Sequence, residues 1–494
     1  MTPEPPTPGS DPADPDALAS SIAQGWFADL PPGRLDYAGV PLGHALRRSV
    51  MLIVGRALRR QAFPEHWARD QALLEELDRL GIQRQPRVRG WRARGRRGLQ
   101  RAGQMAGQAR AALASRRGGA PLALLRDAPR LDPLQAALAA AGFRVQRFGG
   151  ALVPLSPRAR PGERPEALAA RARALLRESL HDRGLPVADP ELRALETDAL
   201  LGMARIRRLH GLLGALRPRV VVLHDDTAPD GLETALVCRA RGIPCVSIQH
   251  GLDCERFFLD QVYAGLKCVW GPERRDRLLA QGVPPERIQV TGSLAYDHQA
   301  PTQPAAPDPN WLWFTRPHLP DKCLLPGRCV HEGDTILGWL LEALRARPEV
   351  ELLIKPHPGD YAALYAHRVR QAGLEDRVRV VDDPPEACLA QAALVFSEDS
   401  TTVVDTLRHG RPLIHTHASA TPPAVPVAEG GVGGRAEGAR ALGSAVTALE
   451  GGGTLPAGTD REPRRRFLQV HVGPMDGSTA QRLVELAVRR SQVP

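Results

Sequence analysis

Two short polar stretches that follow predicted strands in the second half of the chain have residue types suited to binding a phosphate. Residues 355–358 (KPHP) come directly after an apolar strand, 352–354. Each proline restricts the preceding residue to extended conformations, so Lys355 and His357 are predicted to lie in a stiff loop. A cation and an imidazole there suit a phosphate or diphosphate, although a lone histidine is more often structural. Arg316 also ends a predicted strand and is placed to reach a phosphate.

The second stretch, residues 397–405 (SEDSTTVVD), follows another apolar strand and begins a predicted helix. Asp399 or Ser400 suits the N-cap position of that helix. The amides of its first turn and the hydroxyls of Ser400 and Thr401 predict a phosphate cradle. Asp405, about one and a half turns further on, is placed to accept hydrogen bonds from ribose hydroxyls. The alternative is ordinary capping of a buried helix.

The first half of the chain offers candidates for proton transfer. His250 and Gly251 end a predicted strand, and Gly251 permits close approach or a positive φ. His250 is predicted to face the second half as general base for an acceptor hydroxyl, the alternative being a structural histidine in a tight turn. Asp225 and Asp226 follow the strand 219–223 and are candidates to orient an acceptor or act as the base. Helix capping and surface charge are the alternative for these two acids.

Alternating short apolar runs and helix-length stretches would position these residues. This rhythm begins near residue 121 and predicts parallel sheets with crossover helices. Two such series predict an α/β protein with two doubly wound domains that bind a ligand between their strand ends. The strands are predicted at 121–125, 143–145, 219–223, 244–249, 267–270, 288–291, 311–315, 350–354, 378–381, 394–397 and 412–415, with a Gly-rich loop at 425–437.

The predicted divisions of the 494 residues follow from these patterns and from composition. They are a disordered tail at 1–17, a helical, Arg-rich extension at 18–118, a first Rossmann-like domain at 119–298, a Pro-rich linker at 299–310, a second Rossmann-like domain at 311–430 and C-terminal helices at 431–494.

Composition and cysteine use argue against a membrane-spanning or secreted protein. The longest uncharged apolar run near the N-terminus, residues 49–54, is far shorter than the roughly 20 residues of a membrane helix. The first residues lack the basic and apolar regions of a secretory signal. The seven cysteines form no Cys-x-x-Cys pair, so they are interpreted as reduced thiols of a cytoplasmic protein, and structural zinc is not expected. His415 and His417 are interpreted as loop residues.

The charge of the chain is concentrated in one strip. Net charge is +10, yet the segment Arg84–Arg117 has 11 arginines and no acidic residue, so the remaining 460 residues carry −1. Three interpretations are open: a solvated, partly helical linker, a surface that docks on anionic lipid or a lipid-linked acceptor, and a nucleic-acid site. The last is the least favoured, because Trp91 is the strip's one aromatic residue.

Four segments resemble GT-B-fold enzymes of bacterial surface-polysaccharide synthesis: IPCVSIQHG (243–251), VWGPERRDRLLAQGVPPERIQVTGS (269–293), IKPHP (354–358) and SEDSTTVVDTLRHGRPLIH (397–415). That group includes capsule polysaccharide biosynthesis transferases, the CDP-glycerol glycerophosphotransferases of teichoic acid synthesis, and Kdo- and sialyltransferases with an HP motif. The resemblance covers about residues 215–415.

The resemblance implies a GT-B fold in which two Rossmann-like domains, the first for the acceptor and the second for the nucleotide donor, face a central cleft. It implies that His357, Ser400 and Thr401 hold the donor phosphates, that Asp405 lies near the ribose and that His250 is on the acceptor side. No metal or other cofactor is implied, because histidine, lysine and helix amides stabilise the leaving nucleotide.

The predicted function is therefore transfer of a sugar or polyol-phosphate unit from a nucleotide-activated donor to a hydroxyl of a cell-surface polysaccharide or glycolipid. The enzyme is expected in the cytoplasm, docked on the inner membrane through the arginine strip, and nucleic acid is not an expected partner. Three alternatives remain: a CDP-glycerol-type glycerophosphotransferase, a UDP-GlcNAc 2-epimerase-like enzyme, and a non-catalytic nucleotide-binding GT-B scaffold.

Overall fold

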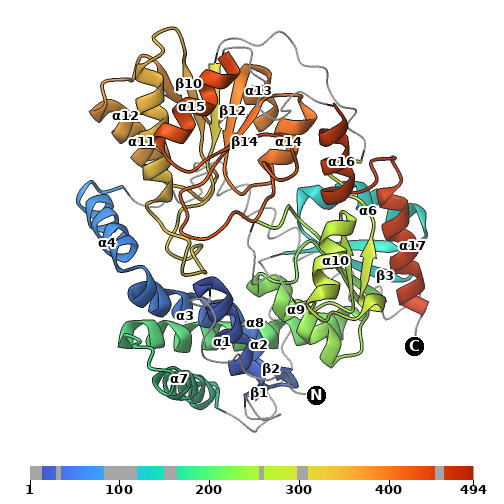
Figure 1. The fold of residues 1–494 in the computed structure, drawn as a ribbon. Coiled ribbons are helices and arrows are strands. Elements are labelled where there is room, and N and C mark those ends of the chain that lie inside the picture. The colour runs from blue at the N-terminus through green and yellow to red at the C-terminus, as the bar shows by residue number, and fades with distance from the viewer. Residues whose placement is uncertain are drawn as a thin grey trace.

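The computed structural model describes residues 14–28, 35–82, 119–149, 164–254, 261–297, 310–450 and 461–492. Two six-stranded sheets, both parallel throughout, form the two halves of the molecule (Figure 1). The arginine strip and the predicted linker up to residue 309 lie outside the described residues. Among the described helices, none combines the length and apolar character needed to cross a membrane.

The first sheet has the strand order β4-β3-β5-β6-β7-β8. Helices α6 (Asp132–Ala140) and α17 (Thr479–Gln492) cover one face, and α8 (Asp189–Leu216) and α9 (Pro229–Ala240) cover the other. Because both faces are covered, a strand such as β5 is continuously apolar rather than alternating. The strands are β3 (Leu122–Arg126), β4 (Arg144–Phe148), β5 (Val220–Leu223), β6 (Cys245–Ile248), β7 (Leu266–Val269) and β8 (Ile288–Val290).

The second sheet has the order β11-β10-β9-β12-β13-β14. Helices α11 (Glu332–Arg345), α12 (Ala362–Gln371) and α15 (Ala439–Glu450) cover one face, and α13 (Pro385–Ala390) and α14 (Thr402–Arg408) cover the other. The strands are β9 (Asn310–Phe314), β10 (Leu352–Lys355), β11 (Val378–Val380), β12 (Ala392–Ser397), β13 (Leu413–Thr416) and β14 (Gly434–Ala436).

Strand β14 lies inside the stretch predicted to be a Gly-rich loop, so that part of the prediction is wrong. The strand has only three residues and forms the edge of the sheet beside β13. A Cβ on Gly433 would lie 2.6 Å from the carbonyl oxygen of Leu413, so the glycine permits this close approach. Glycine, which suggested a loop here, is therefore needed at Gly433 because β13 and the start of β14 lie so close together.

The last two helices, α16 (Arg461–His471) and α17, return to the first half of the molecule (Figure 1). Helix α16, which lies in the stretch predicted to hold C-terminal helices, packs against α10 (Pro272–Ala280), and α17 packs against α6. A Cβ on Gly271 would lie 2.2 Å from the carbonyl oxygen of Val470, which shows how closely the two segments meet. Apolar side chains from both halves, among them Leu252, Trp270 and Phe314, share one core.

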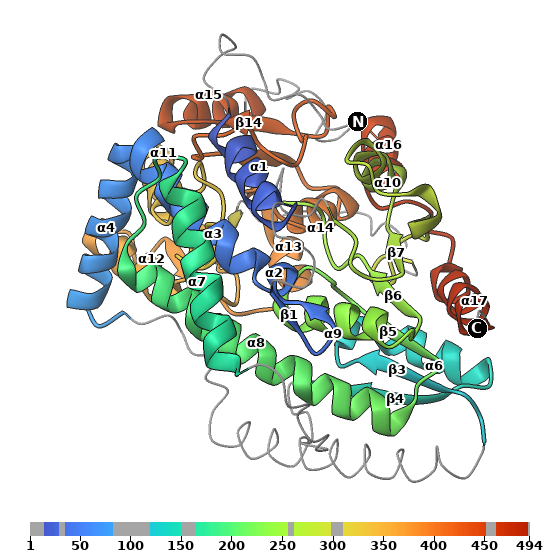
Figure 2. The same cartoon turned by 90° about the horizontal axis from the view of Figure 1, so that it is seen from below.

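The described part of the N-terminal extension, residues 18–28 and 35–82, is mainly helical, as expected, and lies beside α8 (Figure 2). Its elements are α1 (Pro15–Ala28), the ribbon β1 (Asp36–Tyr37) and β2 (Val40–Pro41), α2 (Leu42–Ala45), α3 (Arg47–Ala62) and α4 (Pro64–Arg79). Helix α7 (Pro165–His181) runs along α8 on the same side. Helix α1 begins inside the predicted disordered tail, where buried Asp16 accepts a hydrogen bond from the amide of Gly327.

The extension also contacts the second half, through the segment 315–331 between β9 and α11. A Cβ on Gly55 would lie 2.1 Å from the carbonyl oxygen of Leu324, so α3 is in direct contact with this backbone. Arg59 is buried and pairs with Asp70 on α4 at 3.4 Å. The Arg59 guanidinium also donates hydrogen bonds to the carbonyl oxygens of Cys323, Leu325, Pro326 and Arg328.

The carboxyl ends of the two sheets face each other. The amide of Leu252, which follows β6, donates a hydrogen bond to Thr401 Oγ1, which follows β12, at 3.1 Å. Gly251 lies in the same contact, because a Cβ there would be 2.7 Å from Thr401 Oγ1. The predicted architecture is confirmed over the described residues: the chain is an α/β protein with two Rossmann-like domains whose strand ends face each other, and helices precede the first of them.

Replacing Arg59 with alanine should lower the free energy of unfolding by about 3–5 kcal/mol, because it removes the cation that pairs with Asp70 and leaves several buried carbonyl oxygens without a donor. Urea unfolding followed by tryptophan fluorescence measures this loss. Arg79→Ala, at the exposed end of the neighbouring helix, is the matched control and should change stability by about 0.5 kcal/mol or less. Equal effects of the two substitutions would show that the buried contacts of Arg59 do not support the fold.

Candidate functional site

Three strand ends of the second sheet bring the predicted phosphate-binding residues to one edge. Lys355 of β10 and Ser397 of β12 both pair with Phe314 of β9, so the loops that follow these strands begin side by side. The amide of His357 donates to Thr315 Oγ1 at 3.0 Å, and the amide of Arg316 donates to the Glu398 carboxylate at 3.3 Å. The structure therefore places the backbone of Lys355, His357, Arg316 and the 398–401 loop together, and it buries the Arg316 side chain.

The KPHP loop holds its two polar side chains in defined orientations. The His357 side chain is exposed, and its Nδ1 accepts a hydrogen bond from the amide of Gly359 at 3.1 Å. A neutral imidazole that accepts at Nδ1 carries its proton on Nε2, which makes Nε2 a donor suited to a phosphate oxygen. The Lys355 ammonium lies 3.2 Å from the exposed carboxylate of Asp382.

The loop between β12 and α14 differs in part from the predicted phosphate cradle. Thr401, rather than Asp399 or Ser400, is the N-cap residue of α14, and no side chain caps the helix. Ser400 Oγ accepts a 3.3 Å hydrogen bond from the amide of Thr402, so it still faces the first helical turn. The Thr401 hydroxyl accepts the amide of Leu252 described above.

Asp399 is a buried anchor, so the prediction that it caps the helix is wrong. It pairs with Arg328 and with His415, and its Oδ1 accepts the amides of Ala424 and Val425 at 3.1 and 2.9 Å. Burial alone would raise the pKa of Asp399, but Arg328 and His415 hold it well below its usual value. The carboxylate therefore ties the β12–α14 loop to segment 315–331 and to residues 424–425.

Asp405 lies at the contact between the two halves. Burial raises the pKa of this carboxyl group, while a hydrogen bond from the Tyr296 hydroxyl opposes the rise. The Arg408 guanidinium lies 4.9 Å from the centre of the Tyr296 ring. The structure thus shows a protein partner for the residue that was predicted to contact a ribose.

His250 and Asp225 come together at the edge of the first sheet. Asp225 accepts hydrogen bonds from the amide and hydroxyl of Thr227 at 2.8 and 2.7 Å, and His250 lowers its pKa against the effect of burial. The rings of His224 and His250 lie 6.4 Å apart. Although His250 is exposed by surface area, the protein around its ring desolvates it and lowers its pKa despite Asp225. A neutral His250 at pH 7 is able to accept a proton.

The loop that carries His250 is fixed by side chains rather than by regular structure. Gln249 donates to the carbonyl oxygen of Gly251 at 2.8 Å and accepts the amide of Trp270 at 2.8 Å. The Trp270 indole returns a hydrogen bond to the carbonyl oxygen of Gln249 at 2.8 Å. Arg130 also donates to the carbonyl oxygen of His250. These contacts restrict the backbone that carries His250.

Asp226 occupies a different environment from Asp225. It is completely buried, and it accepts hydrogen bonds from Lys267 Nζ at 2.5 Å, from Ser247 Oγ at 2.9 Å and from the amides of Tyr263 and Ala264 at 3.0 Å. A carboxylate with four partners and no exposed surface is not accessible to an acceptor hydroxyl. Asp226 instead links β5, β6 and β7. The sequence signal for this buried pair was Lys267, a lysine in an otherwise apolar strand, and it was not used in the prediction.

Sequence analysis also missed a charged cluster beneath the phosphate-binding edge. His318 Nε2 lies 2.8 Å from Glu398, and Asp360 accepts hydrogen bonds from Thr315 and Tyr365 at 2.6 and 2.7 Å. Burial would lower the pKa of His318, but Glu398 and Asp360 outweigh it and raise that pKa to about 10. Thr315 also holds the amide of His357, so the cluster supports the KPHP loop. The sequence signal for this cluster was that its polar residues follow closely after the strands β9, β10 and β12.

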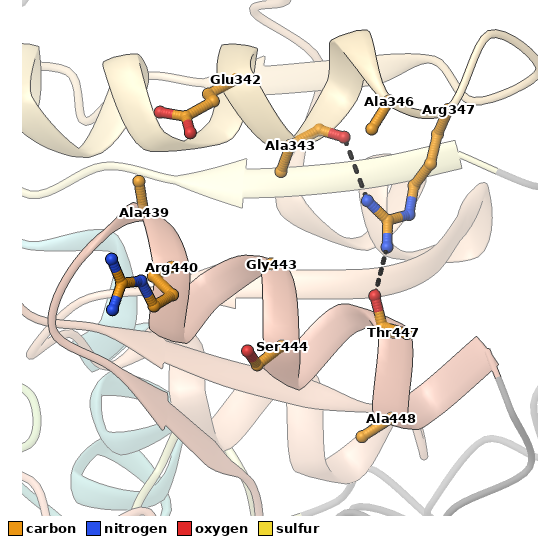
Figure 3. Close-up of a pocket in the computed structure, with 10 residues that line it drawn as sticks. All are labelled: Glu342, Ala343, Ala346, Arg347, Ala439, Arg440, Gly443, Ser444, Thr447 and Ala448. Carbon is orange, nitrogen blue, oxygen red and sulfur yellow. Dashed lines mark hydrogen bonds between the residues drawn. The ribbon is translucent and has the colours of Figure 1, made fainter.

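A surface hollow of about 640 Å³ lies away from all of these residues, between α11 and α15 (Figure 3). Alanine and glycine form much of its lining, and Arg347 spans it with hydrogen bonds to the carbonyl oxygen of Ala343 and to the Thr447 hydroxyl. None of the predicted site residues lines it.

No protein-family profile and no curated protein sequence matches the chain. Among solved structures, it is similar to a putative UDP-N-acetylglucosamine 2-epimerase from Listeria monocytogenes (14% identity, 74% of this chain and 95% of that chain, TM-score 0.47). It is also similar to UDP-GlcNAc 2-epimerase from Neisseria meningitidis bound to UDP-GlcNAc (13%, 74% and 99%, 0.45) and to Anabaena HepE in complex with UDP and glucose (14%, 75% and 100%, 0.42). Similarity of this degree does not assign an activity to this chain.

The His318 cluster predicts a pH dependence of stability. The pKa of His318 is about 10 in the folded protein and about 6.5 in an unfolded chain, so its contribution is complete below about pH 6.5 and disappears as the pH rises through 10. Wild type should therefore lose of the order of a few kcal/mol more stability between pH 7 and pH 10 than His318→Gln does. Urea unfolding across this range measures the difference. His181→Gln, at an exposed histidine, should follow the wild-type profile; a His318→Gln profile parallel to wild type would contradict a charged His318.

Proposed function

We propose that this protein is a GT-B transferase that moves a sugar or polyol-phosphate unit from a nucleotide-activated donor to a hydroxyl of a cell-surface polysaccharide or glycolipid. The proposal depends on one observation. The contact between Leu252 and Thr401 brings the edge that carries His250 against the edge that carries Lys355, His357 and Arg316. Ligands of two-domain α/β proteins bind between such strand ends.

The second domain is proposed to bind the nucleotide through its phosphates. Lys355 and Arg316 supply positive charge, and His357 Nε2 donates a directed hydrogen bond. The hydroxyls of Ser400 and Thr401 complete the polar lining. As the donor bond breaks, negative charge grows on the phosphate oxygen, and these donors stabilise it without reorganising. The reaction as proposed uses no metal or other cofactor at this site.

The first domain is proposed to activate the acceptor. His250 takes the proton of the acceptor hydroxyl as its oxygen attacks the donor, while the electron pair of the broken bond leaves with the nucleotide phosphate. Asp225 is a positioning residue, because its charge favours the imidazolium that forms. Asp226 is left out of the reaction because it is buried and fully hydrogen-bonded.

Docking of the Arg84–Arg117 strip on the inner membrane face remains a separate proposal.

Binding of one nucleotide should depend on His357. Thermal unfolding of the full chain is measured with CMP, CDP, UDP, GDP and ADP. We expect one of them to stabilise wild type, by about 2.7 kcal/mol at a concentration 100-fold above its dissociation constant. The shift should be lost in His357→Ala, because the directed phosphate donor is removed. His367→Ala, on the outer helix α12 of the same domain, should keep it. Absence of a shift with every nucleotide would contradict nucleotide binding at this edge, and with it the proposed transfer reaction.

Turnover should depend on His250 more than binding does. With the nucleotide sugar that the thermal measurements select, release of free nucleotide to water is followed in wild type and His250→Ala. The variant should be slower by about 10²–10⁴-fold, the usual contribution of a general base, while its nucleotide-induced thermal shift is unchanged. His181→Ala is the control. Conversion of the donor into its C2 epimer without release of nucleotide would contradict the transferase and support the epimerase-like alternative.

A further inference from the structure

Three clusters of histidine, cysteine and carboxylate side chains in the described residues have ligand atoms close enough to share a cation. In two of them the protein supplies its own cation. Asp399, grouped with His415 and His417, is bonded to the Arg328 guanidinium. In the cluster of His318, Glu332 and Glu398, His318 itself carries the positive charge between Glu398 and Asp360. The third cluster, His66, Cys329 and His331, consists of neutral ligands that are typical of transition metals.

The geometry of the third cluster fits shared coordination. One ligand atom of each side chain lies within 4.8 Å of the other two. His66 Nδ1 lies 3.6 Å from Cys329 Sγ. A tetrahedral zinc ion, with Zn–S near 2.3 Å and Zn–N near 2.0–2.1 Å, places a sulfur and a nitrogen ligand about 3.6 Å apart. The observed separation, which without metal is that of a hydrogen bond between the thiol and the imidazole, also matches two ligands on the same ion.

A carboxylate orients His331 in the way that metal-binding histidines are commonly oriented. The Nδ1–H of His331 donates to Asp70 Oδ1 at 2.7 Å, and the other oxygen of Asp70 is held by Arg59 at 3.4 Å. Because Nδ1 is the donor, Nε2 carries the lone pair that can bind a metal. A histidine fixed by a carboxylate through its second nitrogen is a recurring feature of zinc sites.

The cluster has a route to solvent and a place for a further ligand. His331 lines a surface hollow of about 400 Å³ that is bounded by α4, α11 and α12. Three protein ligands leave one position of a tetrahedral ion for water. A metal ion can therefore reach the site without unfolding the protein around it.

We propose that His66, Cys329 and His331 bind a zinc ion that joins helix α4 of the N-terminal extension to the segment between β9 and α11. His66 and Cys329 are 263 residues apart in the sequence, so no short motif such as Cys-x-x-Cys could reveal this site. The Cys329 thiol loses its proton when the metal binds. The site is separate from the proposed substrate site, and its test does not depend on that function.

The first experiment measures metal in the full chain, purified without a metal-affinity tag. Apo protein is titrated with Zn²⁺ against a chromophoric chelator, and bound zinc is counted by atomic emission. We expect one zinc ion per chain, and we expect Cys329→Ala and His66→Ala to weaken binding by more than about 100-fold, because each removes a ligand. Cys323→Ala, at another buried cysteine of the same segment, is the matched control and should bind zinc as wild type does.

The second experiment keeps the proposal testable if a cysteine variant folds poorly. Wild type is loaded with Co²⁺, which should give the charge-transfer absorption of a thiolate ligand and the visible bands of a tetrahedral ion. The charge-transfer band should be absent in Cys329→Ala and present in Cys323→Ala, while His66→Ala should alter the visible bands. Wild type that binds neither metal, or variants that bind both as wild type does, would overturn the proposal.

Discussion

The structure depends on one buried stretch of irregular backbone, the segment 315–331 between β9 and α11. Irregular backbone usually lies at the surface, because its amides and carbonyls need water when no helix or sheet pairs them. Here most of the segment is buried, so other parts of the protein supply the partners. Arg59 donates hydrogen bonds to four carbonyl oxygens of the segment. The Asp70 carboxylate accepts hydrogen bonds from two of its amides, and the Asp16 carboxylate accepts one from a third amide. The N-terminal helices are thus required by the second domain as well as packed on the first.

The same segment connects those helices to the proposed phosphate-binding edge. It begins at Thr315, whose hydroxyl donates to Asp360 and accepts the amide of His357. It continues through His318, which is charged because Glu398 and Asp360 enclose it. Replacing either carboxylate would leave the buried His318 cation with only one of its two negatively charged partners. The loss of folding stability would be much larger than for an exposed ion pair. The rigidity of the KPHP loop therefore comes from buried charges as well as from its prolines.

The sequence was sufficient to predict most of the strands and the sheet edges that carry polar residues, but not the contacts between side chains. Apolar runs predict strands well when both faces are buried, as in β5, whereas β14 is too short and too rich in glycine to show that signal. The rule that ligands bind at the ends of parallel strands led to the choice of His250 and His357, and the structure places both at sheet edges. It could not separate Asp225 from Asp226, because the difference arises from Lys267, 41 residues away on another strand. Nor could it foresee that Asp399 pairs with Arg328, 71 residues earlier.

Thr401 shows how a single hydroxyl can belong to both the fold and the proposed site. Its oxygen accepts the amide of Leu252 and so joins the two domains, at a point where Gly251 has no side chain to intervene. A hydroxyl has two acceptor lone pairs and one proton to donate. Accepting the Leu252 amide leaves the proton of Thr401 to be donated elsewhere, and a phosphate oxygen is an acceptor without protons of its own to offer. The contact that holds the two sheet edges together is therefore chemically compatible with phosphate binding by the same side chain.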